Sequence, residues 1–359
     1  MAGYLIRGVV LPDTEPRDLW IADGVVVEGP LADADVLATD CWVLPGLVDA
    51  HCHIGMGAEG AVPRGVAWAQ AVADRNAGTL LVRDAGCPAD TRWIDAEPTL
   101  PRLVRAGRHI ARTRRYIRHL AAEVEPEQLV AEATRQALAG DGWVKLVGDW
   151  VDRSVGDLAP SFPAETTAEA IAAVHAVGAR ITAHCFGEEA VADLVDAGID
   201  CIEHGTGLTD EVIAAMAARG TALVPTMCNL DNFPIHAVEG EDKFPVYGAH
   251  MKDLWRRHHE TLGKAREAGV PIYCGTDAGT TVTHGRSPSE IEHLGRIGDA
   301  DFALGAASWR ARPWLGRENL EVGAPADLVV YPVDPRQDLR VVQGPSLVVL
   351  RGAVVGGPR

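Results

Sequence analysis

The sequence predicts an α/β protein built as a (β/α)8 barrel of the TIM type, with a small split β-sandwich domain formed by both chain ends. Three observations predict this fold class. Short apolar runs alternate with helix-like segments through the middle of the chain. Further strand-like runs lie near both ends. The length of 359 residues suits one large barrel with an accessory unit.

The two chain ends resemble each other in pattern, because each carries short apolar runs separated by turn residues. These strand-like runs are 3–11, 19–28, 326–334 and 346–355. Two β-rich pieces at opposite ends of a chain can pair only if they meet in space. We therefore expect residues 1–42 and 320–359 to form one discontinuous domain, and residues 43–319 to form a catalytic barrel.

The central part contains eight apolar runs that end in polar residues: 43–50, 79–84, 102–110, 143–148, 181–184, 199–204, 221–226 and 270–276. Most are followed by helix-like segments, the clearest being 125–139, 166–178, 187–197, 208–219 and 249–268. Glycine follows several of these segments, as is common at helix C-termini. Eight strands that alternate with helices are the pattern of a (β/α)8 barrel.

Composition narrows the class of partner. Lysine and arginine number 33 against 50 acidic residues, a net charge of −17, which disfavours nucleic acid and anionic membranes. No apolar run is long enough to span a membrane, and the first residues lack a signal-peptide pattern. Seven scattered cysteines without a C-x-x-C pair suit reduced thiols. We expect a cytoplasmic protein with a small-molecule substrate, and a homo-oligomer is compatible with this composition.

The segment from Val43 to His53, VLPGLVDAHCH, carries two histidines at the end of an apolar run. Successive side chains of a strand point to opposite faces, so His51 and His53 point the same way and Cys52 points away. Two imidazoles at the end of a buried strand are half of a metal site. Taken alone, such a pair is more often polar surface.

Other predicted strands also end in polar residues, and the active site of a barrel lies at these C-terminal ends. Each residue alone has a structural interpretation, since a lysine can extend to solvent and an aspartate can cap a turn. Six such residues on five strands of one barrel together predict a metal site. They are His51, His53, Lys145, His184, His204 and Asp277.

The pattern PGLVDAHCH…K…H…EHGT…GTDAG, with ADLVV near the end, resembles the amidohydrolase superfamily in its two-metal form with a carboxylated lysine. It covers nearly the whole chain. The local sequences are most similar to the dipeptidase-like, imidazolonepropionase-related branch. Imidazolonepropionase-type members bind one metal and lack the lysine of strand four, so Lys145 groups this chain with the two-metal members.

The resemblance implies a ligand set. His51, His53 and Asp277 would hold one divalent metal, and His184 and His204 a second. Lys145, as a CO2-derived carbamate, would bridge them, and a lysine among apolar neighbours has the lowered pKa that makes its free amine available. Nitrogen and carboxylate ligands favour Zn2+, although Mn, Co or Fe fits the same set. A metal-bridging hydroxide would attack a polarised carbonyl, with the catalytic Asp277 moving the proton.

Two segments are candidates for substrate recognition. Residues 102–119 contain seven arginines, and an arginine there could clamp a substrate carboxylate. The alternative is a solvated loop with salt bridges. The long segment 226–251 could be a lid, a pocket wall or a packed structural excursion. Candidate substrate contacts, each of which also has a purely structural interpretation, are Arg108, Arg115, His119, Trp150 and His284.

The function implied is a metal-dependent hydrolase of an amide-type C–N bond, in a dipeptide (Xaa-Pro-like) or an N-acyl amino acid. The alternative is a hydrolase of ureas, carbamates, lactones or related small molecules with the same site. A non-catalytic scaffold is a third hypothesis, but scaffolding relatives have lost the ligand set that is intact here. A deaminase usually uses one metal and lacks the bridging lysine.

Overall fold

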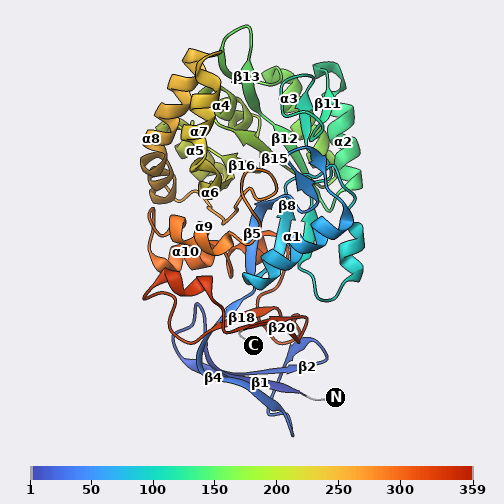
Figure 1. The fold of residues 1–359 in the computed structure, drawn as a ribbon, viewed down its shortest axis with the longest axis vertical. Coiled ribbons are helices and arrows are strands. Elements are labelled where there is room, and N and C mark those ends of the chain that lie inside the picture. Colours follow the sequence, from blue (N-terminus) through green and yellow to red (C-terminus); the bar gives the residue numbers. More distant parts are fainter. Residues whose placement is uncertain (1–2, 358–359) are drawn as a thin grey trace.

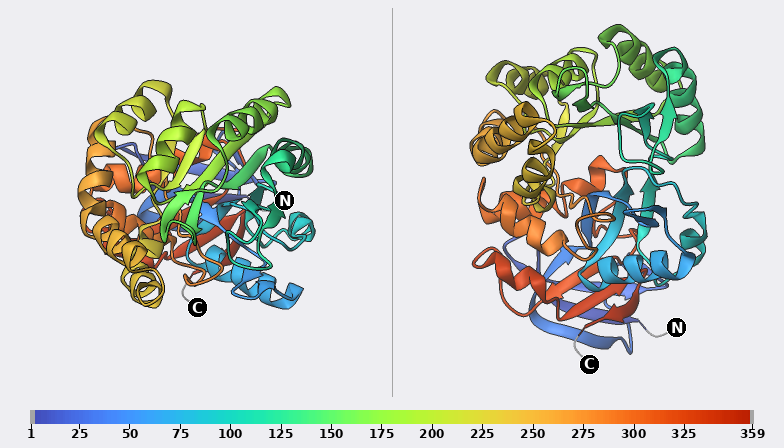
Figure 2. Two further views of the ribbon diagram at one scale, coloured as in Figure 1. Left: turned by 90° about the horizontal axis from the view of Figure 1, so that it is seen from above. Right: turned by 45° about the horizontal axis from the view of Figure 1, so that its top comes forward.

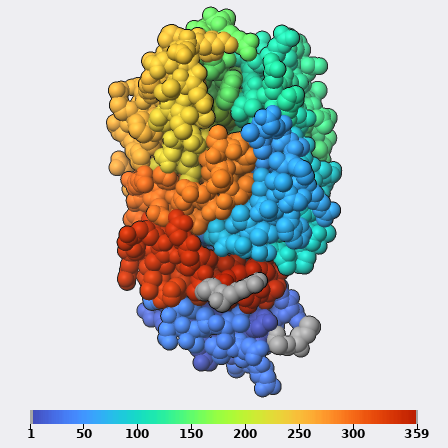
Figure 3. Space-filling model, in the orientation of Figure 1, coloured from blue at the N-terminus to red at the C-terminus, as the bar shows by residue number. Residues whose placement is uncertain are grey.

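A computed structural model describes residues 3–357 of the chain. The molecule is elongated, with a β-sheet at one end and a larger α/β region above it (Figure 1). Both termini lie at the sheet end, so segments far apart in the sequence are neighbours there. The space-filling view shows the N-terminal strands (blue) packed against the C-terminal part of the chain (red) at that end (Figure 3).

The terminal sheet contains seven strands in the order β20-β19-β18-β4-β1-β2-β3. Their bounds are β1 Tyr4–Val10, β2 Pro16–Ala22, β3 Val25–Val27, β4 Asp35–Pro45, β18 Leu328–Tyr331, β19 Leu347–Leu350 and β20 Ala353–Gly356. β18 runs antiparallel to β4, with Val330 opposite Val43, and so joins the two chain ends. Valines and leucines on one face form its core, which includes Ile6, Val43 and Val349.

The two ends therefore meet, but all seven strands belong to one sheet, and the predicted β-sandwich is not confirmed. The predicted domain boundaries at 42/43 and 319/320 stay a prediction. β4 continues past the first of them to Pro45, because its last residues are the partners of β18.

The α/β region is built on two parallel sheets, of three strands (β5-β8-β9) and six strands (β11-β10-β12-β15-β16-β17). Their bounds are β5 Leu47–Cys52, β8 Thr79–Asp84, β9 Arg102–Arg105, β10 Ile110–Arg112, β11 Ala122–Val124, β12 Trp143–Val147, β15 Arg180–Cys185, β16 Cys201–His204 and β17 Ala222–Val224. Several of these strands are buried over their whole length, as expected for strands covered on both faces.

Within residues 3–357 these sheets do not close into one eight-stranded barrel, so the barrel prediction is met in part. The segment 270–276, expected as the eighth strand, contains Pro271, which has no N–H to donate. It still bridges the sheets: Tyr273 N–H donates to Leu223 O (3.0 Å), and Ala50 N–H donates to Cys274 O (2.7 Å). The predicted third strand is split into β9 and β10, with Gly107 in a left-handed conformation between them.

Helices surround the parallel strands on the outside (Figure 2). Their bounds are α1 Arg64–Asn76, α2 Leu129–Ala139, α3 Ala164–Ala176, α4 Glu188–Asp196, α5 Asp210–Arg219, α6 Met227–Leu230, α7 Phe233–Glu241, α8 Pro245–Glu267, α9 Ser287–Leu294, α10 Ala300–Ala306 and α11 Ala311–Trp314. Three 3-10 turns are η1 Arg92–Ala96, η2 Pro126–Gln128 and η3 Leu339–Gln343. In the part of the chain that is described, no helix has the length and apolarity needed to cross a bilayer.

Two short hairpins extend beyond the ends of the parallel strands. They are β6 Met56–Gly57 with β7 Gly60–Ala61, and β13 Asp149–Asp152 with β14 Asp157–Pro160. Both follow directly on strands that carry predicted metal ligands. They therefore form part of the rim around the C-terminal ends of the strands.

Candidate metal centre and substrate cavity

The six polar residues expected at strand ends lie together, on β5, β12, β15 and β16 and on the segment after residue 276. All are buried except Asp277, whose side chain retains 17% exposure toward the cavity above. Burial of so many titratable groups is unfavourable unless they are paired or hold a metal. Their contacts separate into two clusters.

The first cluster consists of His51, His53 and Asp277, whose potential ligand atoms all lie within 4.8 Å of one another. Asp277 Oδ1 is 3.1 Å from Nε2 of each histidine. The opposite ring nitrogens are held from behind, since His51 Nδ1 lies 2.7 Å from Glu203 Oε2 and His53 Nδ1 lies 2.8 Å from Gly86 O. Donation from Nδ1 leaves the Nε2 lone pairs directed at one point, which is the tautomer that a metal ligand needs.

The second cluster is the pair His184 and His204, with His184 Nδ1 2.9 Å from His204 Nε2. His204 Nδ1 is 2.6 Å from the hydroxyl of Thr226, and His184 Nε2 is a buried nitrogen without a hydrogen bond, 3.5 Å from Asp149. Burial lowers the pKa of both rings, that of His204 to about 3. Two neutral imidazoles that face each other suit a shared metal ion.

Lys145 lies beside both clusters. Its Nζ is 3.5 Å from His51 Nε2, and its charge also affects the pKa of His184 and His204. Burial lowers the pKa of the Lys145 amine, which increases the fraction of the neutral nucleophile. The donor set of imidazoles, carboxylate and a neutral amine suits divalent metals with nitrogen and oxygen ligands.

The backbone is left-handed at three points around these clusters. His204, Thr226 and Asp277 have φ values of 69°, 48° and 60°, which residues other than glycine rarely adopt. Each lies where its strand, or the segment 270–276, ends. The turns aim the side chains of these residues into the site, and strain of this kind is common at functional sites.

Glu203 was not predicted as a site residue. It is fully buried, its Oε2 accepts from His51, and its Oε1 lies 2.6 Å from Arg83 Nη2. Burial raises the pKa of Glu203, but the charges of Arg83 and His51 outweigh it and hold this pKa well below its usual range. The signal in the sequence was Arg83 within the apolar run TLLVRD, because a buried arginine requires an acidic partner.

A cavity of about 560 Å3 opens above the clusters. His53, His184 and Asp277 lie at its floor. Figure 3 shows a recess in the upper half of the molecule, away from the terminal sheet. Its aromatic walls are Tyr116, Trp150, Phe186, Phe244 and Tyr247, and its cationic side chains are Arg114, Arg153 and Lys243. Trp150, a predicted substrate contact, lines this cavity, and the segment 226–251 supplies much of one wall.

Two of the predicted substrate contacts, Arg108 and Arg115, do not line this cavity. Arg115 donates to the carbonyl oxygens of Trp150, Ala159 and Pro160 (3.0–3.1 Å). Arg108 donates to the carbonyls of residues 119 and 120 at 3.1 Å. Both guanidinium groups therefore hold loop backbone in shape, and a substrate role for them stays a prediction.

His119 and His284 lie outside the cavity as well. His119 is exposed. His284 packs behind β5, with Nδ1 2.8 Å from Asp74 Oδ2 and 3.6 Å from Cys52 Sγ. Cys52 points away from His51 and His53, so this contact supports the back of the ligand strand rather than the substrate side.

Tyr116 was another residue that the sequence analysis did not select. Its ring packs edge-on against Trp150 and His109, with centroids 4.8 Å and 5.3 Å apart. Burial raises the pKa of the Tyr116 hydroxyl, which stays protonated, and lowers the pKa of His109 to about 3. Both belong to the arginine-rich segment 102–119, in which Arg108, Arg115 and His119 were the predicted substrate contacts.

Comparison with known proteins agrees with this geometry. The model of the "Amidohydrolase family" matches residues 42–355. An uncharacterized protein of Mycobacterium tuberculosis is 54% identical over 353 residues, covering 98% of this chain and 95% of that protein. Imidazolonepropionase of Chromobacterium violaceum is 27% identical over 412 residues, covering 94% and 91%. The solved structure of a Xaa-Pro dipeptidase with bound methionine superposes with a TM-score of 0.84 at 23% identity, covering 98% of this chain and 99% of that one. This likeness implies a TIM-type barrel.

Proposed function

Because the chain belongs to the amidohydrolase family and is therefore an enzyme that acts on carbon–nitrogen bonds, we propose that it hydrolyses an amide bond in a dipeptide or an N-acyl amino acid. The observation that carries this proposal is the convergence of six residues at one place. His53, His184 and Asp277 lie at the floor of the cavity, and His51, Lys145 and His204 are packed with them. The substrate is a small molecule, since the cavity holds only about 560 Å3.

Members of this family generally bind divalent metals. His51, His53 and Asp277 would hold one ion, His184 and His204 a second, and Lys145 as a carbamate would bridge them; the donor types favour Zn2+. Bound metals of this kind lower the pKa of a coordinated water and polarise the substrate carbonyl.

Asp277 is the proton carrier of the proposed reaction. Burial raises the pKa of Asp277, but the charge of His51 and the close contacts with the His51 and His53 rings hold this pKa well below its usual range. Its Oδ1 faces the two histidines, which leaves Oδ2 to take the proton from water and return it to the leaving nitrogen. The remaining exposure of this side chain is toward the cavity, where a substrate would lie.

Recognition of a substrate carboxylate is assigned to the cationic side chains Arg114, Arg153 and Lys243 in place of Arg108 and Arg115. None of the three forms an ion pair within residues 3–357, although the protein is strongly acidic. Each is exposed at the cavity, so it can reach a bound anion without breaking an existing ion pair. The aromatic walls below them suit an apolar acyl or side-chain group.

A panel of Xaa-Pro and other dipeptides and N-acyl amino acids, assayed with Zn2+ and bicarbonate, tests the proposal. We expect hydrolysis of at least one member, two metal ions per chain and a carboxylated Lys145 by mass or density. Fewer than two metals with an unmodified lysine would contradict the two-metal centre. Turnover of phenylureas, carbamates or lactones without any of the panel would favour the alternative substrate class.

A further inference from the structure

His250 lies on α8, one turn after the cavity residue Tyr247, and forms two bonds to carboxylates. Its Nδ1 is 3.0 Å and 3.1 Å from the two carboxylate oxygens of Asp157, and its Nε2 is 3.0 Å from Glu188 Oε2. Neither carboxylate has a hydrogen to offer at neutral pH, so both ring nitrogens must be the donors. The geometry thus requires the imidazolium form.

This imidazolium connects three separate segments. Asp157 begins β14 of the hairpin whose other strand carries Trp150, Glu188 is the first residue of α4, and His250 belongs to α8. A backbone hydrogen bond from Tyr247 N–H to Gly156 O (3.2 Å) joins α8 to the same hairpin. Two of the three segments supply walls of the substrate cavity, and Figure 1 shows all three at the end of the molecule remote from the termini.

A series of contacts also connects the His250–Glu188 pair to the floor of the cavity. Gly187, which precedes Glu188, donates its N–H to Asp149 Oδ2, and Asp149 Oδ1 lies 3.5 Å from His184 Nε2. The start of α4 is therefore held at two points. Asp149, which lies beside the predicted metal ligand His184, binds Gly187, and His250 binds Glu188. Displacing the start of α4 would change the support of His184.

We propose that His250 is a positioning residue: as an imidazolium it holds the β13–β14 hairpin, the start of α4 and the first turns of α8 together, and so sets the shape of the substrate cavity. The proposal rests on the proposed function for its kinetic part only. Loss of the proton removes one of the two bonds, because a neutral ring has a single N–H. The cavity wall then loosens and substrate binding weakens.

The surroundings favour the charged ring. The groups that face the space around His250 are Asp149 from β13, Asp157 from β14, Glu188 and Glu189 from α4, and Tyr247 and Arg257 from α8. The hydrogen bonds that His250 donates to Glu188 and Asp157 raise the pKa of His250 to about 9. We therefore expect the three segments to separate between pH 8 and pH 10.

Kinetics of His250→Asn on whichever panel substrate is turned over test the kinetic part. We expect KM to rise roughly tenfold at pH 7 with kcat changed less than twofold, the size of one lost charge-assisted hydrogen bond. The wild-type KM should rise toward pH 10 and the variant KM should stay flat. Asp157→Asn keeps a hydrogen-bond acceptor but removes its negative charge. The rise in KM should therefore occur at lower pH in this variant than in the wild type. An unchanged KM, or a pH profile unaffected by either substitution, would overturn the proposal.

Hydrogen–deuterium exchange tests the positioning without any substrate. We expect the amides of residues 150–157 and 247–251 to be protected at pH 7 and to lose protection near pH 10 after correction for intrinsic rates. In His250→Asn they should exchange faster than in the wild type at pH 7, and the difference should largely disappear near pH 10. His175→Asn is the matched control, since His175 also pairs with an aspartate (Asp200, 2.9 Å) but lies outside the cavity lining. Wild-type protection in His250→Asn would refute the role, whether or not amide hydrolysis is observed.

Discussion

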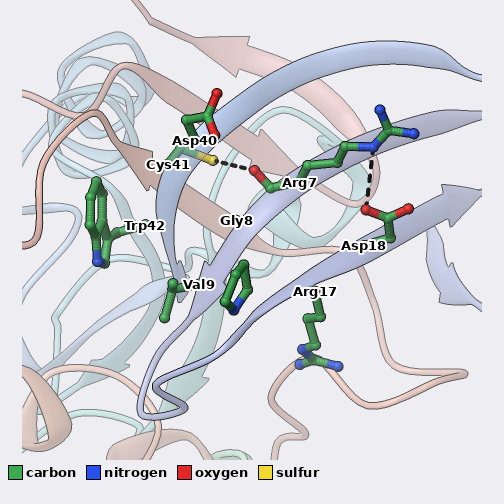
Figure 4. A pocket seen from close by; sticks show the side chains of 9 residues that line it. Arg7, Gly8, Val9, Arg17, Asp18, Asp40, Cys41 and Trp42 are labelled. Atoms are coloured by element: carbon green, nitrogen blue, oxygen red, sulfur yellow. Dashed lines mark hydrogen bonds and ion pairs between the residues drawn. The ribbon is translucent and has the colours of Figure 1, made fainter.

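Two hollows of this molecule differ in kind. The cavity above the parallel strands has buried histidines and a carboxylate at its floor. The hollow on the terminal sheet holds about 330 Å3 and is lined by Arg7, Gly8, Val9, Pro16, Arg17, Asp18, Asp40, Cys41 and Trp42 (Figure 4). Its charged side chains are exposed, and Arg7 pairs with Asp18 at 3.3 Å. Cys41 is buried, donates weakly to Arg7 O, and has a pKa raised to about 11 by burial and by Asp40.

The difference shows that concavity by itself does not indicate a site. The terminal hollow lies between strands whose polar groups are solvated or paired, so nothing in it gains from a ligand. The other cavity concentrates titratable groups that are removed from water and directed at one another, which is unfavourable without a further partner. Substitutions in the two regions should therefore differ strongly in their effects.

The largest expected effect is that of Lys145→Ala. Loss of the proposed metal bridge should lower kcat/KM on the order of 10³-fold or more, equivalent to ~4 kcal/mol of transition-state stabilisation. Short carboxylic acids should restore part of the activity by replacing the carbamate. Cys41→Ala in the terminal hollow is the control and should retain wild-type kcat/KM. Full activity of Lys145→Ala without added acid would contradict the bridging role.

Next in size is the separation of the buried Arg83–Glu203 pair. Arg83→Met leaves Glu203 as an uncompensated buried charge and removes a guanidinium that stacks on Trp143 (4.5 Å). We expect the free energy of unfolding to fall by about 3 kcal/mol, measured by urea denaturation. Arg7→Ala breaks a pair of the same type at the surface and should lower it by less than about 1 kcal/mol. Equal losses would mean that burial is not the deciding difference.

A smaller effect is expected at the cationic side of the cavity. Arg114→Ala should raise KM roughly tenfold for an N-acyl amino acid, the size of one charge-assisted hydrogen bond, and should leave KM for the corresponding amide unchanged. Arg17→Ala, in the terminal hollow, should change neither value. An equal rise for acid and amide would show that Arg114 shapes the wall and does not bind the carboxylate.

The smallest expected effect is the pH dependence of stability that His250 contributes. Its pKa is raised from 6.5 to about 9 on folding by the hydrogen bonds that it donates to Glu188 and Asp157, so the folded state holds the proton more tightly than the unfolded state. The stabilisation is complete below pH 6.5 and is lost as the pH rises through 9. The difference in free energy of unfolding between wild type and His250→Asn should shrink between pH 6.5 and 9.5; a difference that grows over this range would contradict this assignment.

Much of the site followed from local rules. Strand periodicity placed His51 and His53 on one side and Cys52 on the other, and the direction of parallel strands brought His184, His204 and Asp277 to the same end. Glu203 could not be assigned, because its role depends on Arg83, a residue 120 positions away that only the folded sheet brings near. A charged residue within an apolar run was the available signal, and it had no visible partner.

The paths of the loops and the closure of the sheets could not be predicted from these local rules. Arg114 and Arg115 are adjacent, yet the first lines the cavity and the second binds backbone carbonyls, since the path of a loop decides which way each side chain points. Likewise Pro271 and Gly107 interrupt strands that the apolar pattern shows as continuous. Whether the terminal strands form one sheet or two depends on which edges pair, and alternation alone does not specify this.

The pairing of β4 with β18 has a consequence for synthesis on the ribosome. β4 emerges early, but its partner at Val330 follows Val43 by about 290 residues, which at 5–20 residues per second is roughly 15–60 s of translation. During that interval one side of β4 is an unpaired, valine- and leucine-rich strand edge, the kind of surface on which chains aggregate. Slower elongation should therefore lower the yield of native protein, and chaperones that shield such edges should restore it.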